Sequence, residues 1–355
     1  MSNTTVIYRS SDSSAPALEG VTGSLVTLLD ACLVNGYGSQ SGAGWTIAYT
    51  NTSKRVYRNS TSLGTGFYLN VDDSASASGA VAQEALMTGF QSATAIGTGT
   101  GQFPTSAQLN YGIGAVVCRK SNTASSTTRN WTLIADPTCF YLFVETGDYT
   151  APIQTCCFMF GDFYSYSSTD THNCMIVGRN TQNSSSNQYE WSAIANGLAG
   201  NYNSPAMTYT LCGHFIASNF TGTGGSIIFG KHIDATKSGF AGCPSFSGTS
   251  AVSGNGGQTI GGSYVPANAL IYPNPANNGL YLSPVWIHHN GMLRGYFKGL
   301  WAPVQSMPLN HDDTYNGTGS MSAKSFVAQY IVGYNGSNGA ADPGELIVET
   351  SSTWS

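Results

Sequence analysis

The stretch that decides the fold is Cys139–Val144, which reads CFYLFV and is almost wholly apolar. A strand with one face in water alternates apolar and polar residues, whereas this run is apolar on both of its faces. The turn 136–138, reading DPT, comes directly before it. The sequence therefore predicts a short strand that is buried on both faces.

On both sides of this run, the sequence pattern predicts further strands over most of the chain. Apolar and polar residues alternate over short segments that Gly, Asn, Ser and Pro separate. The segments 45–49 and 55–58 flank a turn at 51–53, and 280–288 and 291–297 flank another at 289–290, so each pair predicts a hairpin. The other predicted strands are 6–9, 66–71, 80–90, 115–119, 131–135, 155–160, 173–178, 326–332 and 345–348.

One helix is expected near 24–34. Apolar residues recur there at the spacing that places them on one face of a helix, namely Leu25, Leu28, Leu29, Cys32 and Leu33. Thr22 or Ser24 can cap the start of this helix, and Asn35-Gly36 supplies its stop.

The fold class that follows is mainly β, an antiparallel sandwich or barrel-like body with one short N-terminal helix and long Gly/Ser/Asn-rich loops. The loops are expected at 180–210, 220–226 and 236–263. We expect an N-terminal β domain at 1–178 and a loop-rich C-terminal β region at 179–355, either separate from the first or continuous with it.

The composition of the chain limits the classes of function that are compatible with it. Charged residues are only 9 % of the chain, while hydrophobic residues are 41 % and aromatic residues 12 %. The chain can therefore build a core, but its surface lacks the charges that keep monomers apart. The net charge of −5 and the absence of a basic run exclude nucleic acid as the main ligand. No apolar stretch is long enough to span a membrane.

The chain has eight Cys but no C-x-x-C pair, and its start shows no secretion signal. Thiols stay reduced in a cytoplasm, and most of these residues lie in apolar runs. We therefore expect buried free thiols rather than disulfides or a zinc site.

Motifs along nearly the whole chain resemble a family of tailed-bacteriophage virion structural proteins, which are uncharacterised particle components. The segments that carry the resemblance are 37–39, 44–46, 56–58, 67–73, 131–136, 140–143, 161–166, 230–232, 272–275, 280–286, 293–295 and 299–301 through 348–351. This chain departs from the family pattern by Asn/Ser/Thr-rich inserts near 183–187 and 250–262.

The resemblance implies a virion component, assembled in the host cytoplasm, whose partners are other virion proteins and copies of itself. We expect a non-enzymatic homo-oligomeric subunit of the tail, baseplate or collar. Two alternatives stay open: a capsid decoration (cement) protein, and a carbohydrate-binding receptor-recognition module or depolymerase.

Candidate chemical sites are few, and we expect no catalytic residue, no cofactor and no metal ion. Asp72-Asp73 follows a strand and could bind a cation, although a solvated turn explains it better. His288-His289 and His311 could give a two-ligand site, but adjacent strand residues point to opposite faces.

Aromatic residues are the expected interface anchors, because large rings dominate assembly interfaces. The aromatic motif at 161–166, reading GDFYSY, could also form a sugar-binding platform, but a strand edge with partnered tyrosine hydroxyls is the simpler interpretation. For Trp354, docking on a partner and docking within the chain are equally open. The interface candidates are Trp45, Tyr164, Tyr166, Trp286, Trp301 and Trp354.

Overall fold

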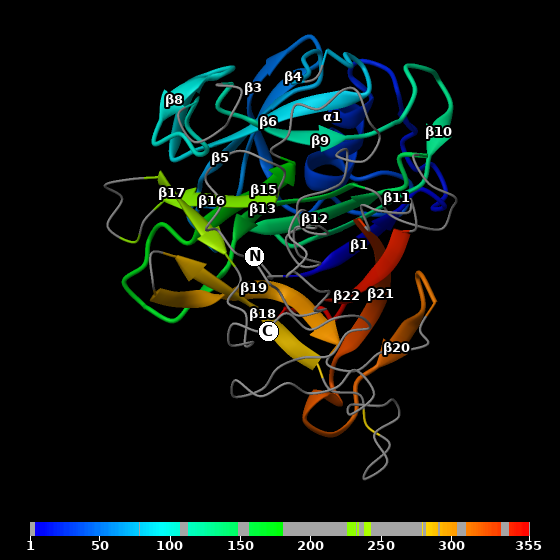
Figure 1. Cartoon of the computed structure of the whole chain (residues 1–355), viewed down its shortest axis with the longest axis vertical. Coiled ribbons are helices and arrows are strands. Elements are labelled where there is room, and N and C mark those ends of the chain that lie inside the picture. The colour runs from blue at the N-terminus through cyan, green and yellow to red at the C-terminus, as the bar shows by residue number, and fades with distance from the viewer. Residues whose placement is uncertain are drawn as a thin grey trace.

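The computed structural model describes residues 4–77, 79–106, 113–147, 156–179, 226–231, 233, 238–242, 279, 282–289, 292–303, 310–334 and 341–354. Over these ranges the chain is mainly β with antiparallel sheets and one N-terminal helical segment, as the sequence predicts. The strands form three stacked layers (Figure 1).

The central layer contains the stretch CFYLFV, which is strand β12. Every residue of this strand is buried. Phe140, Leu142 and Val144 pack into one hydrophobic cluster, and Cys139, Tyr141 and Phe143 pack into a second one on the opposite face. The prediction of a strand buried on both faces is confirmed. The antiparallel order of this layer is β1 (Val6–Arg9), β11 (Trp131–Ala135), β12 (Cys139–Val144), β13 (Cys156–Asp162) and β15 (Cys174–Arg179).

The N-terminal layer covers the first of these faces. Its antiparallel order is β3 (Thr46–Asn51), β4 (Lys54–Arg58), β5 (Tyr68–Asp72), β6 (Glu84–Phe90) and β9 (Val116–Arg119). The predicted hairpin around 51–53 is the β3–β4 pair. Two short pairs lie outside the main layers: β7 (Ser92–Ala95) with β8 (Thr98–Thr100), and β2 (Leu18–Glu19) with β10 (Thr128–Arg129).

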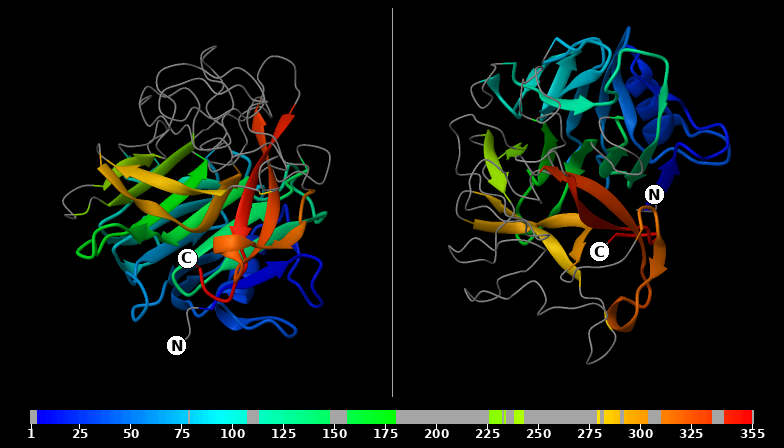
Figure 2. Two further views of the ribbon diagram at one scale, coloured as in Figure 1. Left: turned by 90° about the horizontal axis from the view of Figure 1, so that it is seen from below. Right: turned by 45° about the vertical axis from the view of Figure 1, so that its right-hand side comes forward.

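The C-terminal layer covers the second face of the central layer (Figure 2). Its predicted hairpin is the pair β18 (Leu282–His289) and β19 (Met292–Pro303). Strand β19 pairs with β22 (Ala341–Glu349), which pairs with β21 (Ser325–Tyr334), and β20 (Thr314–Asn316) lies at the edge next to a 3-10 turn, η4 (Gly319–Met321). Strands β16 (Ser226–Lys231) and β17 (Ser238–Gly242) connect β15 to β18 by hydrogen bonds.

The expected helix is present as α1 (Ser24–Leu29) followed by a π-helical turn, η1 (Asp30–Asn35). Its apolar face is buried in the first cluster. The predicted cap is wrong, because neither Thr22 nor Ser24 caps the helix: Asp73 Oδ2, distant in sequence, accepts from the N–H groups of Leu25 at 2.9 Å and Val26 at 3.4 Å. Gly36, with φ of 78°, ends the helix as expected.

Of the sandwich and the barrel-like body that the sequence left open, the described strands form the sandwich. They do not close into a barrel, because β1, β3 and β20 remain edge strands. One expected loop needs correction. The expected loop at 236–263 contains strand β17, since its small residues pair with β16. The loops at 180–210 and 220–225 lie outside the described residues, and the domain boundary near 178 stays a prediction.

Helices in the described part of the chain are all too short or too polar to cross a lipid bilayer. The six cysteines that the structure describes are buried and free, as predicted. Cys212 and Cys243 lie outside the described residues.

Candidate interface and the buried polar network

Three tyrosines gather where the central and C-terminal layers meet. The short strand β14 (Tyr164–Ser165) pairs with β19 so that Tyr164 lies opposite Tyr296. The ring centroids of Tyr164 and Tyr296 are 5.3 Å apart, and those of Tyr166 and Tyr296 are 5.9 Å apart. We call Tyr164, Tyr166 and Tyr296 the tyrosine cluster. Tyr166 is 57 % exposed and Leu293, on the same strand pair, is 50 % exposed.

Behind the tyrosine cluster, the backbones of β14 and β19 lie close together. Gly295 pairs with Ser165, and a Cβ atom at Gly295 would overlap the carbonyl oxygen of Tyr164. Burial raises the pKa of Tyr164 to about 12, so its phenol stays protonated and donates to the carbonyl oxygen of Trp354 at 2.7 Å. The expected strand edge with a partnered hydroxyl is confirmed for Tyr164.

A buried ion pair supports the same strand pair from inside. Arg294 donates from Nε and from one terminal nitrogen to the two carboxylate oxygens of Asp170, at 2.8 Å each. Its guanidinium also donates to the carbonyl oxygens of Lys231 at 2.5 Å and His172 at 3.0 Å. Although burial alone would raise the pKa of Asp170, the hydrogen bonds and charge of Arg294 lower it below its ordinary value. This pair joins 165–172 to β19.

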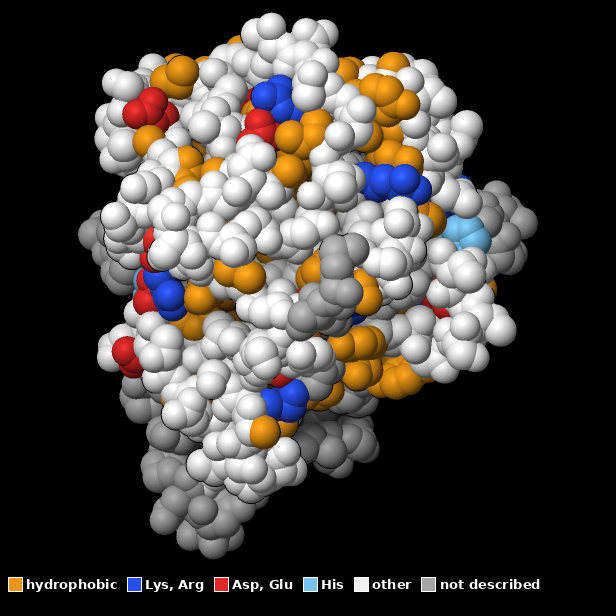
Figure 3. Space-filling model, turned by 180° about the vertical axis from the view of Figure 1, so that it is seen from behind, with side chains coloured by type: hydrophobic (Ala, Val, Ile, Leu, Met, Phe, Trp, Pro, Cys, Tyr) orange, Lys and Arg blue, Asp and Glu red, His pale blue; other side chains and the backbone are white. Residues whose placement is uncertain are grey.

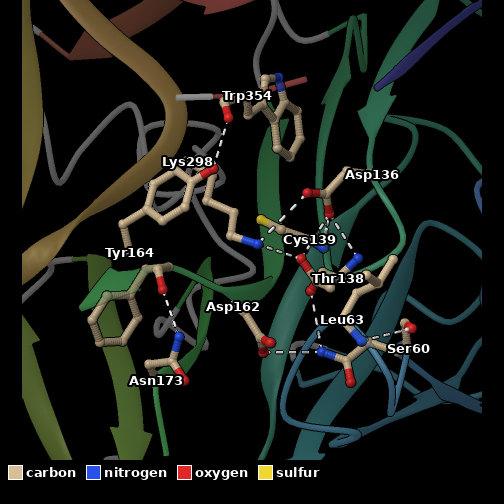
Figure 4. A network of polar contacts seen from close by, with 12 residues as sticks. Ser60, Leu63, Asp136, Thr138, Cys139, Asp162, Tyr164, Asn173, Lys298 and Trp354 are labelled. Carbon is tan, nitrogen blue, oxygen red and sulfur yellow. Dashed lines mark hydrogen bonds and ion pairs between the residues drawn. The ribbon is translucent and has the colours of Figure 1, made fainter. Parts of the chain in front are cut away.

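A second polar network lies in the core between the layers (Figure 4). Lys298 donates to Thr138 Oγ1 at 2.5 Å, and its Nζ lies 3.6 Å from Asp136 Oδ2. Asp136 Oδ1 accepts from the backbone N–H groups of Thr138 and Cys139 and from the Thr138 hydroxyl, at 2.6, 2.7 and 2.8 Å. The network fixes the turn before β12 against β19.

Asp162 ends β13 beside this network and is fully buried. It accepts from the Thr65 backbone N–H at 2.7 Å, the Thr65 hydroxyl at 2.7 Å and the Asn59 amide at 3.0 Å. Burial raises the pKa of Asp162 to about 6, because these donors and the charge of Lys298 offset only part of the desolvation. The network can therefore change its protonation in mildly acidic solution.

The six predicted interface residues fall into different environments. Trp45 and Trp301 are buried; the Trp45 indole donates to the Asp136 carbonyl oxygen at 2.9 Å and packs against Phe140. Both are core residues here, because their rings fill the space between strands. Tyr164 and Tyr166 belong to the tyrosine cluster. The side chain of Trp286 lies outside the described residues.

Trp354 docks within the chain. It is 2 % exposed, its indole donates to the Glu349 carbonyl oxygen at 2.7 Å, and its ring lies 5.5 Å from that of Tyr141. Gly299, with φ of 60°, leaves the space that the indole occupies. Of the two open interpretations of the C-terminal tryptophan, intramolecular docking is the correct one.

The candidate metal ligands whose side chains the structure describes do not form a cluster. Asp72 accepts from Lys54 at 2.6 Å, whereas Asp73 is buried against Lys120, so the expectation of a solvated turn is wrong for Asp73. His311 Nε2 lies 3.6 Å from Asp312 Oδ2, and the side chains of His288 and His289 are outside the description. The described residues contain no group of three or more metal-ligating side chains.

Much of the chain's sparse charge is buried. The buried charged residues include Asp73, Glu84, Arg119, Lys120, Asp136, Asp162, Asp170, Lys231, Arg294, Lys298 and Glu349. These eleven are about a third of the thirteen Lys and Arg and eighteen Asp and Glu of the whole chain, so burial lowers further the already small number of charges available to the surface. On the face that Figure 3 shows, most of the described surface is backbone and uncharged, non-hydrophobic side chains, with apolar side chains between them and few charged ones.

Arg294, Asp170, Tyr296 and Lys298 were not singled out from the sequence. The sequence does contain a feature that points to two of them. Arg294 and Lys298 are cations inside an otherwise apolar and glycine-rich strand, in a chain with little charge. Asp170 lies in a polar segment and gives no such signal.

No protein-family model matches the chain, and no curated protein matches it either.

Proposed function

We propose that the chain is a non-enzymatic structural subunit of a tailed-bacteriophage particle, placed in the tail, baseplate or collar, and that it works by assembling with copies of itself and other virion proteins. The observation that carries the proposal is the burial of charge. A chain with 9 % charged residues that also buries many of them leaves a surface with little electrostatic protection against association. Such a surface is suited to a subunit that remains packed against other subunits of an assembled particle.

The tyrosine cluster supports a specific contact within this proposal. Tyr166 and Leu293 expose apolar surface on a strand pair that Arg294 and Asp170 hold rigid from behind. Preorganised aromatic residues contribute more to assembly than mobile ones, because less conformational entropy is lost on binding. We therefore assign the tyrosine cluster and Leu293 to the assembly interface.

The test is quantitative mass spectrometry of purified particles. The expected result is a copy number that matches a tail, baseplate or collar ring. A copy number that matches the capsid shell would favour the decoration protein instead, and absence of the chain from the particles would contradict the whole proposal.

A second function, carbohydrate recognition, has one observation in its favour. The exposed Tyr166 ring beside Tyr296 offers an aromatic face of the kind on which sugar rings stack. Binding of host-surface polysaccharide that Tyr166→Ala abolishes, while Val81→Ala at another exposed site does not, would favour this function. Equal binding by both variants, or none by the unmodified chain, would dismiss it.

A further inference from the structure

A buried lysine and a buried aspartate meet beneath the N-terminal layer. Asp73 directly follows β5 and Lys120 directly follows β9, and β6 lies between these two strands. The two side chains have no exposed surface, and Lys120 Nζ is in direct contact with Asp73 Oδ1. Because Oδ1 is bonded to Cγ, the amine is also adjacent to the carbonyl carbon of the carboxyl group.

The remaining contacts of the pair fit an amide better than an ion pair. Lys120 Nζ donates to the Val21 carbonyl oxygen at 2.7 Å, and Asp73 Oδ2 accepts from Leu25 N–H at 2.9 Å. A secondary amide has one N–H and one C=O, and these two contacts satisfy both. An ammonium group has three N–H donors. The described residues offer it only Val21 O and Asp73 Oδ1 as acceptors.

The surroundings also favour the uncharged forms of both groups. Burial raises the pKa of Asp73 despite the charge of Lys120, and burial lowers the pKa of Lys120 despite the charge of Asp73. One proton transfer within the pair gives a neutral amine, which is the nucleophile, and a neutral carboxylic acid, which is the better electrophile.

We propose that Lys120 and Asp73 form an intramolecular isopeptide bond. The nitrogen lone pair attacks Cγ, and the negative charge that develops on Oδ2 is held by the backbone N–H groups of Leu25 and Val26, which act as an oxyanion hole. A proton moves from the nitrogen to the Oδ1 hydroxyl group, the Cγ–Oδ1 bond breaks, and water leaves. The amine and the acid thus become an amide and one water, and neither oxidant nor reductant is needed.

The proximity of the Lys120 amine to the Asp73 carboxyl group is the main factor that favours bond formation. Groups held in reacting orientation behave as if present at an effective concentration on the order of 10⁵–10⁸ M. The fold supplies this orientation without a cofactor, since strand ends set the positions of Asp73 and Lys120 and helix α1 supplies the donors. The bond would fasten the end of β5 to the end of β9 across β6.

A second buried pair provides the matched comparison. Lys298 Nζ lies 3.6 Å from Asp136 Oδ2 and donates instead to Thr138 Oγ1. Its amine is directed at a hydroxyl group rather than at the carboxyl carbon. We therefore expect Lys298 and Asp136 to remain unlinked.

The experiment is mass spectrometry of the purified full chain under denaturing and reducing conditions. The expected intact mass is one water below the mass of the unlinked chain. Digestion after Arg, Lys and Glu should give peptide 59–84 joined to peptide 120–129, a pair that is not contiguous in the sequence. Cleavage at Glu84 is essential, because without it a missed cleavage at Arg119 would have the same mass.

Two lysine variants test which lysine forms the bond. Lys120→Arg should restore the full mass, because a guanidinium group is a poor nucleophile, whereas Lys298→Arg should keep the deficit of one water. A full mass for the unmodified chain, a deficit that survives Lys120→Arg, or a water loss confined to the Asp73 peptide would each overturn the proposal. The test on the unmodified chain does not depend on the variants folding, and its outcome is independent of the proposed virion function.

Discussion

Asp162 is the residue whose ionisation is most directly tied to the fold. Its carboxyl group is fully buried at the end of β13, and the groups on Asn59 and Thr65 that donate to it are neutral. Charging it in the folded protein therefore costs more than charging it in water. The sign of its contribution to stability follows from the raised pKa of about 6.

Stability should fall as pH rises through the titration of Asp162. Between its ordinary pKa of 3.8 and about 6, the folded protein keeps a proton that the unfolded chain releases. This residue alone should lower the free energy of unfolding by about 3 kcal/mol across that window and leave it constant above. Urea titrations of the unmodified chain and Asp162→Asn, at constant ionic strength, measure the difference. Parallel pH curves for the two proteins would contradict the prediction.

Trp354 is the residue that ties the C-terminus to the core. Trp354→Ala removes an indole that packs against Tyr141 and fills the space above Gly299. We expect it to lower the free energy of unfolding by about 3–5 kcal/mol, as for other buried large-to-small substitutions. Ser352→Ala, in the same segment but exposed, is the control. Equal unfolding midpoints in urea for the two variants would show that the indole does not stabilise the fold.

At the scale of elements, the β14–β19 pair depends on one buried ion pair. Arg294→Ala leaves the Asp170 carboxylate buried and without its cation, which should cost about 3–5 kcal/mol. The control is Arg55→Ala, whose pair with Asp30 is partly exposed, with side chains 22 % and 17 % accessible, and which should cost about 1 kcal/mol or less. Thermal or urea unfolding measures both. Similar losses for the two variants would contradict the claim that burial makes the Arg294 pair important.

Helix α1 shows how an element depends on residues far away in sequence. Its first turn has no side-chain cap of its own, and Asp73 provides one from the end of β5. The local sequence can predict a cap only from the residues next to the helix start, here Thr22 and Ser24. The start and end of the helix could therefore be predicted, while its cap could not, because the cap depends on the packing of the N-terminal layer.

At the scale of the whole molecule, self-association should depend on the tyrosine cluster. Tyr166→Glu and Leu293→Glu place a charge on an apolar contact, and each should weaken association by about tenfold or more in Kd, since 1.4 kcal/mol is a factor of ten. Val81→Glu is the matched control, because Val81 and Leu293 are both 50 % exposed. Sedimentation equilibrium compares the three. Equal association by all three variants would remove the tyrosine cluster from the interface.

The sequence by itself determined the strand class, the helix and the central strand. These features depend on periodicity, and an apolar run such as Cys139–Val144 has few alternatives to burial on both faces. Its alternate side chains enter two different clusters, as a strand with a period of two requires.

Only the tertiary structure decided which side chains meet. Trp45 and Trp301 are as aromatic in the sequence as Tyr166, yet the first two are buried and the third is exposed. Asp73 meets Lys120, and Asp170 meets Arg294, across separations of 47 and 124 residues. The physical reason is that hydrophobic patterning fixes which face of a strand is buried, but the partners across a core are set by the order and register of the strands.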